Sequence, residues 1–177
     1  MSGFQSKVNQ LPAFAVAGDF ASANPRATAI GGPGYFVAPT GGIQVGAFAW
    51  IANNGTSGGP GLLSQPSVGT PATTAPQVFV GRAGQMAQWY NLLDQYGMTI
   101  PEGFPVTCYE TGDFWMDGLT TNATGGQKIF ASTTVPGQIA TGAAGATISG
   151  YIETKWYVAA GFSCSSGELV KATTYGP

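Results

Sequence analysis

The chain has 177 residues, of which only 8% are charged, and it has a net charge of −2 and no histidine. Average soluble proteins carry about 25% charged residues, so a chain this poor in charge tends to associate unless partners cover part of its surface. Its six basic residues are scattered, which argues against direct nucleic-acid binding, because phosphate neutralisation needs clustered Lys and Arg. No apolar run approaches the roughly 20 residues that span a bilayer, and no signal peptide is evident. We therefore expect synthesis in a cytosol and no membrane association.

Residues 27–81 form a long stretch without a single charge, interrupted by Gly-Gly and Gly-Pro sequences. Such a stretch is too broken to be one helix, and it suits an extended segment that lies against another surface. We interpret 1–81 as an extended, charge-poor arm with the first strands, in which 62–76 is a loop or part of the arm. Residues 82–177 are interpreted as a denser β-rich module, and the two parts together as a single domain.

Short segments rich in aromatic and β-branched residues, separated by turn residues, predict strands at 42–51, 77–80, 105–110, 127–132, 146–159 and 168–174. Apolar residues at three- and four-residue spacing predict one short helix over 83–96. Strands and helices do not alternate, so we predict a mainly β fold, an antiparallel sandwich or barrel with an extended N-terminal arm.

The only cluster of acidic side chains is Glu110, Asp113 and Asp117, close in sequence to Trp115. Paired carboxylates beside an aromatic ring occur in glycosidases, and carboxylates also bind Ca²⁺, although this spacing matches no EF-hand loop. Gly-Asp and Asp-Gly are also ordinary turn dipeptides, and we favour that interpretation. Without histidine the histidine-dependent triads cannot form, and no phosphate-binding loop is present. We predict no catalytic residues, metal, cofactor or small-molecule substrate.

Cys108 and Cys164 are the only cysteines of the chain. Without a secretion signal we expect two reduced thiols, and the sequence leaves a disulfide open. Two cysteines in a chain that lacks histidine cannot complete a zinc shell.

A series of short motifs, from about residue 12 onwards, resembles a known family by its order and number. The motifs are VAGDFASANPR at 16–26, GGPGYFVA at 31–38, GIQVGAFAW at 42–50, VGR at 80–82, IPEGFPVT at 100–107, GDFW at 112–115, GQKIFA at 126–131 and GELVK at 167–171. Together they resemble the structural cement proteins of tailed bacteriophages.

The resemblance implies a capsid decoration protein on the outer face of a phage virion. Such a protein joins neighbouring capsomers of the major capsid protein and stabilises the head against the pressure of packaged DNA. The resemblance also implies a jelly-roll-like fold, a homo-dimer or homo-trimer, and no catalytic residues.

We predict that aromatic and charged residues of the first third of the chain contact the capsid, namely Phe14, Asp19, Phe20, Pro25, Arg26, Tyr35, Phe36 and Trp50. For each aromatic residue the alternative is packing within the molecule. Asp19 and Arg26 are expected to fix the register of the arm by an ion pair or hydrogen bonds to a neighbour. The alternative function is a carbohydrate- or host-surface-binding β module displayed on a virion, which would use exposed rings such as Trp89, Trp115 and Tyr151.

Overall fold

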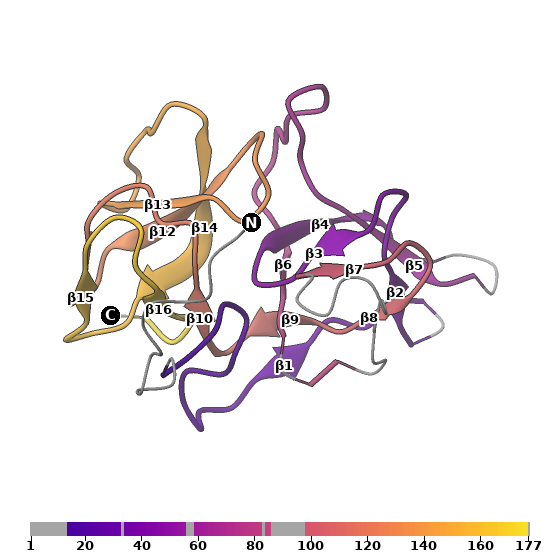
Figure 1. Ribbon diagram of the computed structural model, residues 1–177, viewed down its shortest axis with the longest axis horizontal. Coiled ribbons are helices and arrows are strands. Elements are labelled where there is room, and N and C mark those ends of the chain that lie inside the picture. The colour runs from indigo at the N-terminus through magenta and orange to yellow at the C-terminus, as the bar shows by residue number, and fades with distance from the viewer. Residues whose placement is uncertain (1–13, 33, 56–58, 83, 86–97, 177) are drawn as a thin grey trace, which may run out of the picture.

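The computed structural model describes residues 14–176, except for 33, 56–58, 83 and 86–97. All regular structure in the described residues is β, and two main sheets lie side by side (Figure 1). The strands of the seven-stranded sheet lie between 27 and 111, and those of the five-stranded sheet between 113 and 173. The chain therefore passes from one sheet to the other at Gly112.

The seven-stranded sheet has β1 and β8 at its two edges. Its order is β1 (Ala27–Thr28), β9 (Cys108–Thr111), β6 (Val78–Val80), β4 (Phe48–Asn53), β5 (Gly61–Ser64), β2 (Phe36–Val37) and β8 (Pro105–Val106). The β2–β5 pair is parallel and the other pairs are antiparallel. A separate two-stranded sheet pairs β3 (Ile43–Gln44) with β7 (Thr99–Ile100).

The five-stranded sheet is antiparallel throughout. Its order is β10 (Asp113–Met116), β16 (Val170–Thr173), β14 (Tyr151–Val158), β12 (Lys128–Ser132) and β13 (Ile139–Gly142). A last small sheet pairs β11 (Ala123–Thr124) with β15 (Ser163–Cys164). The loop between β5 and β6 projects at the top of the view (Figure 1).

The alternation of side chains along the strands produces two hydrophobic cores. In β4, Phe48 and Trp50 belong to the core that the two main sheets share, whereas Ala49 belongs to a second core on the opposite face. In β6, Phe79 likewise faces the shared core, whereas Val80 faces the second one. Both faces of these central strands are covered, which explains why their sequences are apolar at nearly every position.

The mainly β prediction is confirmed, with corrections in detail. None of the described residues is helical, so the predicted short helix is not seen; apart from 84 and 85, the range 83–96 lies outside the described residues. Both main sheets have two edges, so the observed strand order gives no closed barrel. Within the described residues, no helix is long and apolar enough to cross a membrane.

The predicted strands agree best where the sequence is densest in apolar residues. The strand predicted over 42–51 is two strands, β3 and β4, and the strand predicted over 146–159 begins only at Tyr151. Gly150 has a φ of +80°, a left-handed conformation that ends the preceding turn. The segment 62–76, predicted as a loop or part of the arm, begins with residues 62–64 of β5 and is irregular after them.

Candidate interaction surface

Residues 14–30, here called the strap, run along the edges of both main sheets. The amide of Gly18 donates to the carbonyl of Trp115 at 2.7 Å, and the amide of Ala21 donates to the carbonyl of Asp113 at 2.9 Å. These bonds add the strap to the free edge of β10. Further along, β1 pairs with β9 at the edge of the seven-stranded sheet. The strap therefore joins the two sheets within one chain.

Side chains reinforce the position of the strap. The ring of Phe20 packs against Tyr109 and Phe114, with centroid distances of 5.8 and 5.4 Å, and the guanidinium of Arg26 lies 3.9 Å from the Phe20 ring centroid. Asp19 forms an ion pair with Arg82 at 3.0 Å. The predicted register-fixing charges of the strap thus have partners within the same chain.

The carboxylate of Asp113 is a polar anchor for the strap. Its Oδ2 accepts hydrogen bonds from Ser22 Oγ and Asn24 Nδ2, both at 2.6 Å. Asp113 is only 7% exposed, and its Oδ1 is buried without a hydrogen-bond partner. Nearby, the hydroxyl of Tyr175 donates to the carbonyl of Pro25. The C-terminal end of the chain therefore also holds the strap.

The predicted contact residues fall into groups with very different exposure. Phe36 and Trp50 are buried in the two cores, so their side chains pack within the molecule. Phe20 is partly buried at the junction of strap and sheets, and Tyr35 is half-buried. Phe14, by contrast, is 78% exposed. Capsid contact by the eight residues stays a prediction, and among its aromatic members Phe14 offers the most free surface.

Phe14 of the strap is the first member of an aromatic row that continues through Trp115 of β10 to Phe162, which also packs against the shared core. Its ring packs edge-to-face on Trp115 at a centroid distance of 5.1 Å, and Trp115 packs in the same way on Phe162 at 5.6 Å. Trp115 lies between Phe114 and Met116, which point into the shared core, so its own side chain lies on the outer face of the sheet.

The same outer face carries lysines from three neighbouring strands. In the register of the sheet, Lys171 is opposite Trp115 and Lys128 is opposite Tyr157, and Lys155 has the parity of Tyr157. We call the set the lysine–aromatic face, with members Trp115, Lys128, Lys155, Tyr157 and Lys171. Scattered in the sequence, the lysines are gathered by strand pairing.

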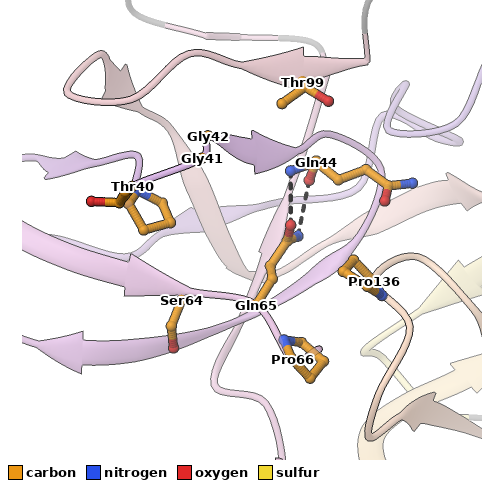
Figure 2. Close-up of a pocket in the computed structure, with 10 residues that line it drawn as sticks. Thr40, Gly41, Gly42, Gln44, Ser64, Gln65, Pro66, Thr99 and Pro136 are labelled. Atoms are coloured by element: carbon orange, nitrogen blue, oxygen red, sulfur yellow. Dashed lines mark hydrogen bonds between the residues drawn. The ribbon is translucent and has the colours of Figure 1, made fainter. Parts of the chain in front are cut away.

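An open pocket of about 330 Å³ lies between the region of β3, β5 and β7 and the loop that carries Pro136 (Figure 2). None of its described lining residues is charged. The Oε1 of Gln65 accepts a hydrogen bond from the amide of Gln44 at 2.8 Å. Its Nε2 donates hydrogen bonds to the carbonyls of Gln44 and Phe48 at 3.1 and 3.2 Å. These bonds satisfy the backbone of the turn between β3 and β4, so Gln65 has a structural role.

Over residues 4–174, the sequence matches the family of the XM1 gp53 minor capsid protein. The chain belongs to this family. No curated protein matches the chain. The sequence resemblance to phage cement proteins is thereby supported at a coarser level, that of a phage capsid-associated family.

The acidic cluster in this member of the minor capsid protein family does not converge on one site. Glu110 is exposed on β9, whereas Asp113 is buried under the strap. Asp117 is exposed, and its Oδ1 accepts a hydrogen bond from the amide of Gly118. Among the described residues, no three His, Cys, Asp or Glu side chains are grouped so that they could hold a metal ion. Tyr151, one of the proposed sugar platforms, makes a hydroxyl contact of 3.1 Å with Thr120, and Trp89 lies outside the described residues.

Both cysteines of this family member are free thiols. Burial, with a smaller contribution from nearby Glu110, raises the pKa of the Cys108 thiol from 9.0 to about 12. Burial also raises the pKa of Cys164, which is only partly covered. Near neutral pH both are therefore protonated.

Proposed function

We propose that the chain is a virion structural protein that decorates the outer surface of a phage capsid and cements neighbouring subunits of the major capsid protein. The observation that carries the proposal is the match to a minor capsid protein family over 4–174, nearly the whole chain. The low charge and the exposed ring of Phe14 support it, because both suit a protein whose surface is covered by partners.

The proposed mechanism is thermodynamic. A protein that binds the assembled shell and not its separated subunits stabilises the assembly by mass action. At a free concentration one hundred times the dissociation constant, each occupied site adds about 2.7 kcal/mol. A modest contact thus becomes a large stabilisation when it is repeated over the shell. In this proposal the chain has no enzymatic activity and works as a small homo-oligomer.

The strap gives the chain mechanical continuity suited to this role. A clamp transmits load between the subunits that it joins only if its own parts do not separate. The strap connects the edges of both main sheets through backbone bonds, the Asp19–Arg82 ion pair and the Asp113 anchor. Load applied to one sheet therefore reaches the other through the strap as well as through the shared core.

The decisive experiment adds the purified chain to phage heads from which it is missing. We expect saturable binding, a higher melting temperature of the shell that rises with the concentration of added protein, and subunits visible on the outer surface by cryo-electron microscopy. Binding without any rise in the melting temperature would support decoration of the capsid but contradict the cementing role. Density only inside the shell would contradict both.

A further inference from the structure

We infer that the lysine–aromatic face is the capsid-binding surface and that it recognises a carboxylate-rich, partly apolar patch on the major capsid protein. The inference rests on the proposed function and specifies which face of the molecule meets the shell and by what chemistry.

The first support is the placement of the lysines. All lysines that the structure describes, Lys128, Lys155 and Lys171, lie on β12, β14 and β16 of one sheet. The pairs Lys128–Tyr157 and Lys171–Trp115 place two of them directly beside aromatic residues on its outer face. Paired residues of neighbouring strands point to the same side of a sheet, so the three ammonium groups share that side.

The second support is that two of these lysines have no ion-pair partner among the described residues. Lys128 is occupied: it is 3.8 Å from Glu153, donates to the carbonyl of Thr154 and lies over the Tyr157 ring. Lys155 and Lys171 form no ion pair with any described residue. In a chain with six basic residues, two unpaired lysines on one face are a substantial share of its cationic surface.

The acidic groups near this face do not cancel it. Glu153 forms the ion pair with Lys128 and accepts a hydrogen bond from the amide of Gly145 at 2.7 Å. Asp113, on the same side of β10 as Trp115, is covered by Ser22 and Asn24. Asp117 lies just beyond the end of β10. Glu153 and Asp113 are thus engaged by other groups, and neither forms an ion pair with Lys155 or Lys171.

The third support is the aromatic row that borders the lysines. Phe14, Trp115 and Phe162 form consecutive edge-to-face contacts, and Phe14 is largely exposed at the start of the strap. Rigid aromatic side chains are the commonest anchors of protein interfaces, and flanking charges add specificity and speed of association. Aromatic anchors with two unpaired lysines fit a protein surface that offers an apolar hollow and carboxylates.

The test compares two variants that change the net charge equally. The first variant, Lys155→Gln with Lys171→Gln, removes two positive charges from the face. The second, Thr73→Glu with Ala75→Glu, adds two negative charges at exposed positions of the loop between β5 and β6. At low salt we expect the lysine variant to bind heads about tenfold more weakly and with a flatter salt dependence than the wild type. The loop variant and a Lys155→Arg, Lys171→Arg variant are expected to bind like the wild type.

Phe14→Ala is a second probe that leaves the charges unchanged. Phe14 is 78% exposed, so the substitution should not affect folding, and we expect several-fold weaker binding at all salt concentrations. Unchanged binding of the lysine variant, with the wild type bound normally, would overturn this inference and leave the proposed function standing. A wild-type chain that does not bind heads would overturn both. Lysine-dependent binding to host envelopes and not to heads would show that the partner is a cell-surface polyanion.

Discussion

Asp113 is the residue at which the strap depends most on one side chain. Its Oδ2 receives two short hydrogen bonds from the strap, at 2.6 Å each, in a site that is 93% covered, as the 7% exposure shows. Hydrogen bonds to a charged acceptor are worth about 1.5–3 kcal/mol each, and a donor left buried without a partner costs a similar amount. The two hydrogen bonds from Ser22 and Asn24 thus offset part of the free-energy cost of burying the carboxylate.

We predict that Asp113→Ala lowers the free energy of unfolding by about 2–4 kcal/mol, because both strap donors lose their acceptor. Ser22→Ala, which removes one donor, should cost about 1–2 kcal/mol. Urea denaturation followed by tryptophan fluorescence measures both values. A cost for Asp113→Ala no larger than that for Ser22→Ala would show that Asn24 contributes nothing.

Cys108 predicts a dependence of stability on pH. The thiol ionises near its ordinary pKa of 9.0 in the unfolded chain and near 12 in the folded protein, because burial disfavours the thiolate. Between these values the unfolded chain has lost a proton that the folded protein retains, so the free energy of unfolding falls as pH rises, by up to about 1.4 kcal/mol per pH unit. Below pH 9 the thiol makes no such contribution.

The corresponding variant is Cys108→Ala, whose stability should fall less steeply between pH 9 and 10.5 than that of the wild type. Some slope should remain, because burial also raises the pKa of Tyr109 and of Cys164. Urea denaturation at several pH values measures the slopes. Identical slopes in the two proteins would mean that Cys108 is accessible to water.

At the scale of elements, the strap shows why a segment can be recognised as extended without its partner being known. The charge-free stretch 27–81 and its Gly and Pro content predict an extended arm over 1–81, and the strap belongs to the first part of that range. The bond from Gly18 to Trp115 joins residues 97 positions apart, as their numbers show, and no local pattern encodes it. Sheet edges attract extended segments, but which edge is chosen depends on the assembled sheets.

Two glycines in left-handed conformations give a matched test of the docked strap. Gly18 has a φ of +85°, and a Cβ there would lie 2.6 Å from the backbone nitrogen of Arg82, whereas Gly41 has a φ of +87° and open space around it. Gly41→Ala should cost only backbone strain, about 1–2 kcal/mol. Gly18→Ala should cost about 3 kcal/mol or more, because the strap must also move.

Hydrogen exchange of the backbone amides measures the movement. In Gly18→Ala the amides of Ala21 and Trp115, which bond across the strap and β10, should exchange faster, and in Gly41→Ala they should not change. Equal exchange in both variants would show that strain alone, and not the contact with Arg82, determines the cost.

At the scale of the whole molecule, the shared core makes the two sheets one cooperative unit. Phe79 of the seven-stranded sheet contacts Phe114 and Trp156 of the five-stranded sheet at centroid distances of 5.1 and 5.7 Å, and Phe48 contacts Trp156 at 6.2 Å. Aromatic residues of both sheets thus pack against one another. Because the contacts cross the boundary at Gly112, neither sheet can expose its inner face without exposing that of the other.

We predict a single unfolding transition for the chain, and a loss of about 3–5 kcal/mol in Phe79→Ala with that single transition preserved. Coincidence of far-ultraviolet circular dichroism with tryptophan fluorescence across a urea titration is the measurement. Two separated transitions in the wild type would contradict the shared core as the source of cooperativity.

The sequence by itself determined the β class, because this follows from the spacing of apolar residues and from the turn residues between them. It also located the central strands, since burial on both faces leaves continuous apolar runs such as that of β6. The tertiary structure decided the docking of the strap, the burial of Asp113 and the gathering of Lys128, Lys155 and Lys171 on one face. Each of these depends on strand pairing between distant residues, which is set by the fit of whole sheets and not by neighbours along the chain.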